Sequence, residues 1–261
     1  MPPEWRGLLA RPIAVVAAHP DDETIGLGAL LPGMPRAHIM HVTNGAPRDP
    51  ADARAAGFAT TEAYARARRK ELLAAMHLAG VEPERTCEAG FTDQEVSLHL
   101  AELARRLAGW FAELSAAAVF THPYEGGHPD HDAAALAVHA ACRLAPGRPA
   151  AIEFTSYHDR GGSMETGVFL AGGTAVTEMP LSAEARAFKR KLFDCFLSQR
   201  HMLDNFPIGV ERFRPAPEYD FTAPPHAGIL FYERFDWGMT GERFRALAHA
   251  ALQALGLGNH L

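Results

Sequence analysis

Two short stretches of the sequence concentrate histidines and carboxylates. The first, HPDDE at residues 19–23, ends an apolar run of the chain. The second, GGHPDHD at residues 126–132, lies far along the chain and also follows an apolar run. The tripeptide His-Pro-Asp therefore occurs twice, each time with further ionisable side chains directly behind it.

Histidine and carboxylate together are typical metal ligands. Two histidines and one carboxylate suit Zn²⁺ and leave a fourth position for water, whose pKa zinc lowers to about 7. A further carboxylate could accept the proton of this water, and another histidine could stabilise an oxyanion and protonate a leaving amine. The two stretches contain a residue type for each role, whereas a helix cap would explain only one of the acids.

We expect strands and helices to alternate through the first part of the chain. Short apolar runs predict strands at residues 13–18, 39–43, 118–121 and 152–156. Apolar residues at helical spacing predict helices at residues 24–31, 62–79, 95–114 and 130–142. Towards the C-terminus the pattern predicts two more helices, with a proline-rich loop at 205–228 between them, at residues 183–204 and 244–255.

This alternation predicts an α/β fold in which a mostly parallel sheet is covered by helices on both faces. We expect a single domain over residues 1–261, with a core at about 11–160 and a C-terminal elaboration at about 161–261. Ligands of such sheets bind beyond the carboxyl ends of the strands. Both His-Pro-Asp stretches follow predicted strands, so we expect them to share one site.

Composition limits the partners of the protein. Its 261 residues have a formal net charge of −6, which disfavours nucleic acid because a surface that binds nucleic acid is basic. We find no apolar run that predicts a membrane span or a signal peptide. The three cysteines are widely spaced, so we expect reduced thiols and a cytoplasmic protein. The sequence is compatible with a homo-oligomer and does not set the oligomeric state.

The motif AAHPDDETIGLGALL, paired with GGHPDHDAAALAVHAA, resembles the PIG-L/LmbE family of zinc-dependent N-deacetylases. The resemblance extends over residues 11–145. It implies a Rossmann-like α/β fold and the removal of an acetyl group from N-acetylglucosamine-containing compounds or related amides.

The same resemblance implies roles for individual residues. Three of them match zinc ligands of the family: His19, Asp22 and His131. Asp21 matches the general base, and His128 matches the residue that stabilises the oxyanion and donates a proton. Asp130 would hold a histidine in orientation, as carboxylates around metal sites do.

Arg68 matches a family pattern, Arg-x-x-Glu, on the predicted helix 62–79. The helical spacing also points Arg68 inward, where an arginine needs an acidic partner. Two interpretations stay open: Arg68 contacts the substrate, or it forms an ion pair with Glu71.

Other matches to the family are weak. Ser198-Gln199 and Glu211 resemble family positions, but ordinary packing and capping are the favoured interpretation. Tyr124 and Glu125 precede the second motif, and we assign them no role.

The sequence thus predicts a zinc-dependent hydrolase that removes an N-acetyl or other N-acyl group from an N-acetylglucosamine-type sugar or glycoconjugate. One alternative is a metal-dependent amidase acting on a non-sugar amide, and another divalent ion such as Fe²⁺ could replace zinc. Non-haem Fe(II) oxygenases also use two histidines and one carboxylate, but strand–helix alternation disagrees with their double-sheet barrel. A non-catalytic metal- or sugar-binding module would not need Asp21, and a two-metal phosphoesterase would need more acidic ligands.

Overall fold

The computed structural model describes residues 5–261 and contains a seven-stranded sheet in the order β3-β2-β1-β4-β5-β9-β8. Five strands run parallel: β1 (Ile13–Ala17), β2 (Ala37–Pro47), β3 (Thr86–Asp93), β4 (Ala118–Thr121) and β5 (Ala150–Phe154). Two antiparallel strands extend the sheet beyond β5: β9 (Val210–Pro215) and β8 (Thr177–Pro180). This arrangement confirms the expected α/β fold with a mostly parallel sheet.

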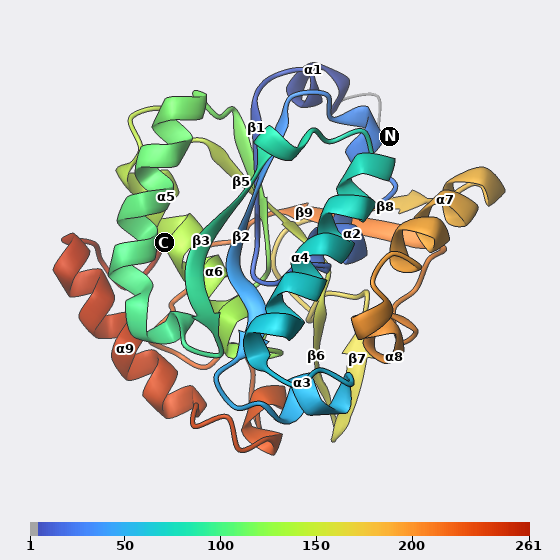
Figure 1. The fold of residues 1–261 in the computed structure, drawn as a ribbon. Helices are drawn as coiled ribbons and strands as arrows, with labels where there is room; N and C mark the ends of the chain where they lie inside the picture. The colour runs from blue at the N-terminus through green and yellow to red at the C-terminus, as the bar shows by residue number, and fades with distance from the viewer. Residues whose placement is uncertain (1–4) are drawn as a thin grey trace.

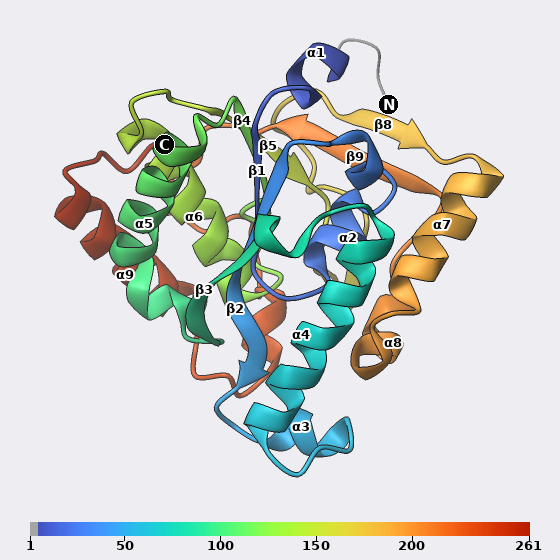
Figure 2. The ribbon, with the colours of Figure 1, turned by 45° about the horizontal axis from the view of Figure 1, so that its top comes forward.

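Helices cover both faces of the sheet (Figures 1 and 2). One face is covered by α2 (Asp22–Leu27), α4 (Thr61–Leu78) and α7 (Ala183–Phe193), and the other by α5 (Leu100–Leu114), α6 (Pro129–Leu144) and α9 (Gly241–Leu255). Side chains along β1 alternate between the two cores, with Ile13 and Val15 in one and Ala14 and Val16 in the other. A central parallel strand is therefore apolar on both faces, which explains its unbroken apolar run.

Several short elements gather at one end of the molecule (Figure 1). They are the hairpin of β6 (Tyr157–Arg160) and β7 (Ser163–Thr166), α3 (Ala51–Ala55) and α8 (Arg200–Leu203). A further short helix, α1 (Arg6–Leu9), precedes β1, and 3₁₀ turns lie at Leu31–Gly33, Pro83–Arg85, Val96–His99, Leu197–Gln199 and Phe231–Arg234.

Three strands of the sheet, β3, β8 and β9, were missed by the sequence pattern. β8 is a short edge strand with one buried residue, so it carries no apolar run. β3 is an edge strand of mixed burial that contains Glu88 and Gly90, so no apolar run marks it. β9 lies inside the predicted loop 205–228. It was not predicted as a strand because Glu211 and Arg214, which are buried in ion pairs, make the segment look polar.

The predicted helix 183–204 is wrong in its second half. The chain leaves α7 after Phe193 and turns through the 3₁₀ segment Leu197–Gln199 before α8. The turn buries Phe196 and lets the Ser198 amide donate to Glu71. Helix α2 also ends at Leu27 instead of residue 31, and it begins at Asp22 because Asp21 is its N-cap residue.

Among residues 5–261, the structure has no helix with both the length and the apolar character needed to cross a membrane. The three cysteines carry free thiols, as expected.

Candidate metal centre and active site

The two His-Pro-Asp stretches meet at the carboxyl ends of β1 and β4. β1 pairs with β2 on one side and β4 on the other, so the strand order reverses at this point, where open α/β sheets bind ligands. His19 lies in the turn between β1 and α2, whereas His128 and His131 lie at the start of α6. All three line a cavity of about 490 Å³.

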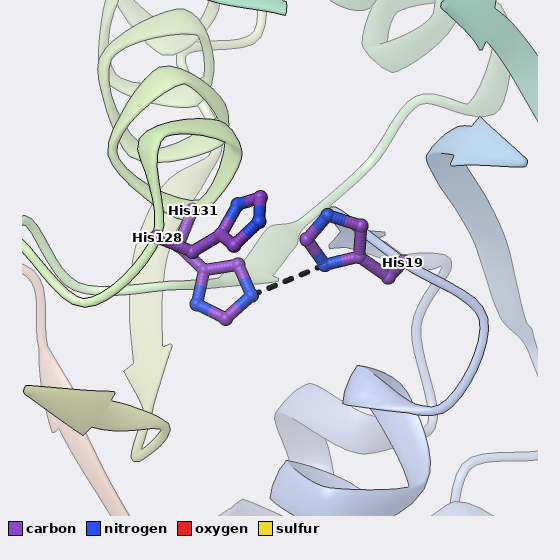
Figure 3. A group of neighbouring side chains, drawn as sticks. All are labelled: His19, His128 and His131. Atoms are coloured by element: carbon purple, nitrogen blue, oxygen red, sulfur yellow. Dashed lines mark hydrogen bonds between the residues drawn. The ribbon is translucent and has the colours of Figure 1, made fainter. Parts of the chain in front are cut away.

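Three ligand atoms of the predicted metal site converge. His19 Nδ1 lies 3.2 Å from Asp22 Oδ2 and 3.3 Å from His131 Nε2, and the latter two atoms are 3.4 Å apart. Figure 3 shows His19 facing the two histidines of α6. Ligand atoms about 2.0–2.2 Å from one Zn²⁺ in a tetrahedral arrangement stand roughly 3.3–3.6 Å apart. The spacing of these three atoms therefore fits one metal ion.

The charge of the site also fits a cation. Three buried carboxylates, those of Asp21, Asp22 and Asp93, raise the pKa of the Arg68 guanidinium. Burial raises the pKa of Asp21 to about 8, so Arg68 alone does not compensate the buried carboxylates. A divalent cation would add positive charge and favour their ionised forms.

A second group of potential ligands, Asp22, His122 and His131, is also close enough to hold an ion. His122 Nε2, however, accepts a hydrogen bond from the Ala18 amide at 3.0 Å. Its lone pair is used by the backbone, so His122 supports the turn after β1 instead of binding a metal.

A third group consists of His19, Asp93, His128 and Asp130. Both oxygens of Asp130 accept backbone amides from the segment after β3, at 2.6 and 3.2 Å. His128 Nδ1 accepts the Asp130 amide at 3.1 Å. Because His128 Nδ1 accepts this amide, a neutral His128 carries its proton on Nε2, the atom that lies near Asp93, and so has no free lone pair for a metal. This favours the group of His19, Asp22 and His131.

Neighbouring groups orient the candidate ligands. Ser156 Oγ lies 3.2 Å from His131 Nδ1, which leaves Nε2 directed at the site. The His19 amide donates to Asp22 Oδ2 at 2.8 Å and fixes that carboxylate at the start of α2. Ser156 follows β5 and was missed, because a single serine behind a strand carries no signal.

Asp21 and Arg68 form a buried ion pair. Arg68 Nη2 donates to Asp21 Oδ2 and to the Pro20 carbonyl, each at 2.9 Å. Arg68 therefore points inward, as expected. Of the two interpretations left open, the ion pair with Glu71 is wrong, because Glu71 accepts from Ser198 instead. Both Asp21 and Arg68 line the cavity.

The backbone of Asp21 is strained. Its φ is +130°, a region that residues with a side chain rarely adopt. The Asp21 amide donates to Glu23 Oε2 at 3.1 Å, and the Asp21 carbonyl accepts from the amides of Thr24 and Ile25. Glu23 is itself buried against His41 at 2.8 Å, so a pair outside the cavity holds Asp21 in position.

Asp130 bonds mainly to backbone amides, and its contact with a histidine is weaker. Its Oδ2 lies 3.5 Å from His19 Nε2, much farther than the 2.6 Å that separates this oxygen from the Gln94 amide. Burial raises the pKa of Asp130 to about 6. Holding the loop after β3 against α6 is therefore its main visible contact.

Asp93 belongs to the site and was missed by the sequence pattern. It is the last residue of β3, and its Oδ1 lies 3.1 Å from His19 Nε2 and 3.8 Å from His128 Nε2. Burial opposes ionisation, but His19 holds the pKa of Asp93 well below its ordinary value. Predicting β3 from the sequence would have placed Asp93 with the other strand ends.

The three histidines of the site have different pKa values, because burial and neighbouring charges act on each of them differently. Loss of hydration lowers the pKa of His131 to about 3 and, with His19 nearby, holds the pKa of His128 well below its ordinary value. Burial also disfavours the charged form of His19, but Asp93 and other carboxylates hold the pKa of His19 well above 6.5. For Asp21, burial outweighs Arg68 and raises the pKa of its carboxyl to about 8.

The weaker sequence matches divide between cavity and core. Ser198 and Gln199 line the cavity. Glu211 is instead buried in an ion pair with Lys189. Tyr124 packs away from the cavity and donates to the Ala223 carbonyl, and Glu125 accepts the Leu170 amide.

Fold and site together define a Rossmann-like α/β protein with a candidate metal centre of two histidines and one carboxylate at the point where the strand order reverses. Residues 14–142 match the family model described as PIG-L: GlcNAc-PI de-N-acetylase. This segment is a PIG-L family domain that contains both His-Pro-Asp motifs, and the resemblance is thereby confirmed. No curated protein matches the chain.

Solved structures share the fold at low sequence identity. A deacetylase of the teicoplanin biosynthesis pathway is 18% identical with a TM-score of 0.62, and the match covers 78% of this chain and 97% of that one. The N,N'-diacetylchitobiose deacetylase of Pyrococcus horikoshii is 16% identical with a TM-score of 0.51, and the match covers 96% of this chain and 82% of that one. The 4-carboxy-2-hydroxymuconate hydratase GalB of Pseudomonas putida is 16% identical with a TM-score of 0.54, and the match covers 75% of this chain and 82% of that one. Because a hydratase shares the fold, the site must decide the reaction.

Proposed function

We propose that this protein is a zinc-dependent hydrolase that removes an N-acetyl group from an N-acetylglucosamine-type sugar or glycoconjugate. The observation that carries the proposal is the convergence of His19 Nδ1, Asp22 Oδ2 and His131 Nε2 next to the carboxylate of Asp21. The family match supports it, as do the two similar structures whose names describe deacetylases.

His19, Asp22 and His131 would hold the metal. When bound there, a divalent ion would polarise an amide carbonyl and lower the pKa of a water molecule. Imidazole and carboxylate ligands suit both Zn²⁺ and Fe²⁺, and the open parallel sheet disagrees with the barrel of the Fe(II) oxygenases.

Asp21 is the proposed general base. Its carboxylate lines the cavity beside the candidate ligands, and Arg68 fixes one of its oxygens at 2.9 Å. A cation bound beside Asp21 would lower the raised pKa of its carboxyl and favour the ionised form. The carboxylate can then accept a proton from the attacking water and return that proton to the departing amine. A module that only bound a metal or a sugar would gain nothing from a carboxylate held there in a strained backbone.

His128 is the proposed stabiliser of the tetrahedral oxyanion. Because its Nδ1 accepts the Asp130 amide, a neutral His128 carries its proton on Nε2. The Nε2–H group can therefore donate to the oxyanion, and it offers a second route for a proton to the amine. The products are acetate and a free amine.

Acetate release tests the proposed function. Chelated protein should release no acetate from N-acetylglucosamine glycosides, and adding Zn²⁺ should restore release. Asp21→Asn should lower kcat by about 10²–10⁴-fold, the contribution of a general base, at unchanged zinc content. The matched control is Asp49→Asn on the exposed surface, which should keep wild-type kcat.

Two results would overturn the proposal. One is full turnover after chelation, and the other is turnover by Asp21→Asn within threefold of wild type. Release of acetate from N-acetyl amino acids but from no sugar would favour the non-sugar amidase instead.

A further inference from the structure

One part of the cavity wall is built from aromatic rings that follow one another in contact. The ring centroids of Tyr157 and Phe231 are 5.6 Å apart, those of Phe231 and Phe235 are 5.3 Å apart, and those of Phe235 and Trp237 are 4.6 Å apart. We call these four residues the aromatic arc. All four line the cavity, and all lie outside the segment 14–142 that matches the family model.

The aromatic arc begins and ends at the histidines of the site. Tyr157 stands edge-on to His131 with centroids 5.2 Å apart, and Trp237 lies 4.8 Å from His128. Any group that extends from the reacting amide along this wall therefore meets aromatic surface at once.

The aromatic arc is open to a ligand. The side chain of Phe235 is 43% exposed, although it stacks on Trp237. Met164 and Met202 line the same cavity, and methionine side chains adapt to apolar ligands of varied shape. Exposed apolar surface of this kind next to polar groups is typical of a binding site.

Polar side chains from other elements also line the cavity. They are Asp52 of α3, Arg68 of α4, Gln199 of the 3₁₀ segment before α8, and His201 of α8. Sugar hydroxyls need such partners, because a buried hydroxyl without a hydrogen bond is costly. The aromatic arc, in contrast, offers mainly ring faces and edges.

We propose that the substrate is amphipathic: its hydroxylated part contacts the polar lining, and a large apolar group attached near the amide lies against the aromatic arc. This inference rests on the proposed function. The apolar group could belong to the acyl chain or to the part attached to the amino sugar, and the test separates these two sources.

Two substrate series test the inference with zinc-loaded protein. The first series carries N-acetyl with methyl, butyl or hexyl as the glycosidic group, and the second carries N-acetyl, N-butanoyl or N-hexanoyl on the methyl glycoside. In one series kcat/KM should rise by up to about fourfold per methylene, the equivalent of about 0.8 kcal/mol per buried methylene. The series that rises identifies the source of the apolar group.

A matched pair of variants locates the effect. Phe235→Ala should flatten the dependence on chain length. Ile229→Ala, an exposed apolar residue of the same segment at 56% exposure, should preserve it. Flat dependence in both series, or unchanged dependence in Phe235→Ala, would overturn the inference.

The test distinguishes failure of the inference from failure of the proposed function. If only the inference fails, the methyl glycoside is hydrolysed and chain length has no effect. If the proposed function fails, no member of either series is hydrolysed. Calorimetric affinities of the same compounds then decide the inference: affinity that rises with chain length supports the assignment of the aromatic arc, and affinity without such a trend overturns it.

Discussion

At the scale of single residues, the site depends on contacts outside the cavity. Asp21 holds a positive φ of 130° because its amide, next to the strained bond, donates to Glu23. Glu23 also accepts from His41 Nε2 and from Thr24 Oγ1, at 2.8 and 2.6 Å. Glu23, the third acid of HPDDE, is therefore a positioning residue for Asp21, the first acid.

Glu23→Gln should lower kcat. An amide group cannot accept all the donors that the carboxylate accepts, and hydrogen bonds to a charged group contribute about 1.5–3 kcal/mol. We expect kcat to fall roughly tenfold or more, since 1.36 kcal/mol corresponds to a factor of ten. The measurement is kcat alongside the free energy of unfolding.

Thr24→Val is the matched comparison for Glu23→Gln, because it removes one donor to Glu23 and leaves the bond to the Asp21 amide. It should affect kcat less. If Glu23→Gln lowered stability but kept kcat within twofold, Glu23 would serve the fold alone.

At the scale of elements, a buried ion pair between α7 and β9 holds α2 in place. Lys189 Nζ of α7 donates to Glu211 Oε1 of β9 and to the Ile25 carbonyl, each at 2.7 Å. The same oxygen of Glu211 accepts the Ala29 amide at 2.7 Å. The C-terminal elements thus hold the helix that carries Asp22.

Lys189→Met should reduce the free energy of unfolding by about 3–5 kcal/mol, because it leaves the carboxylate of Glu211 buried without its cation. The double variant Lys189→Met/Glu211→Leu should recover part of this loss. Urea unfolding with fitted m-values measures both. A loss below 1 kcal/mol in the single variant would mean that water reaches Glu211.

The hairpin β6–β7 contains a histidine whose charge should stabilise the fold. His158 Nε2 lies 3.2 Å from Glu165 and its Nδ1 lies 3.5 Å from Glu125. Burial disfavours the charged form, but Glu125 and Glu165 raise the pKa of His158 above 6.5. The contribution of His158 is therefore fully present below pH 6.5 and is lost as pH rises through the folded-state pKa.

Comparing wild type with His158→Gln across pH tests this sign. The difference in unfolding free energy should be largest below pH 6.5 and should shrink as the pH rises. A difference that grew with pH would show that the folded protein keeps His158 neutral.

At the scale of the whole molecule, the two parts of the chain contribute different things to one cavity. The sequence was sufficient to predict that both motifs follow strands, because β1 and β4 are buried on both faces and give clear apolar runs. The roles of the candidate ligands and of Asp21 followed from the family resemblance. Asp93 escaped prediction because its strand lies at the sheet edge and is half-exposed. The aromatic arc escaped because its members are isolated aromatics in irregular segments, brought together only by the tertiary fold.

The sequence also could not settle the partner of Arg68. Spacing along a helix brings Arg68 near Glu71, but it says nothing of Asp21, which reaches Arg68 through the strained turn before α2. Pairings between distant segments depend on how the sheet is assembled, and a pattern within one segment does not carry that information.

The proposed function depends on a zinc ion held by His19, Asp22 and His131. Anomalous diffraction at the zinc absorption edge, from crystals grown with one equivalent of Zn²⁺, tests this directly. We predict one strong peak bonded to His19 Nδ1, Asp22 Oδ2 and His131 Nε2. A peak bonded instead to His19 Nε2, Asp93 and His128, or no peak at the site, would contradict it.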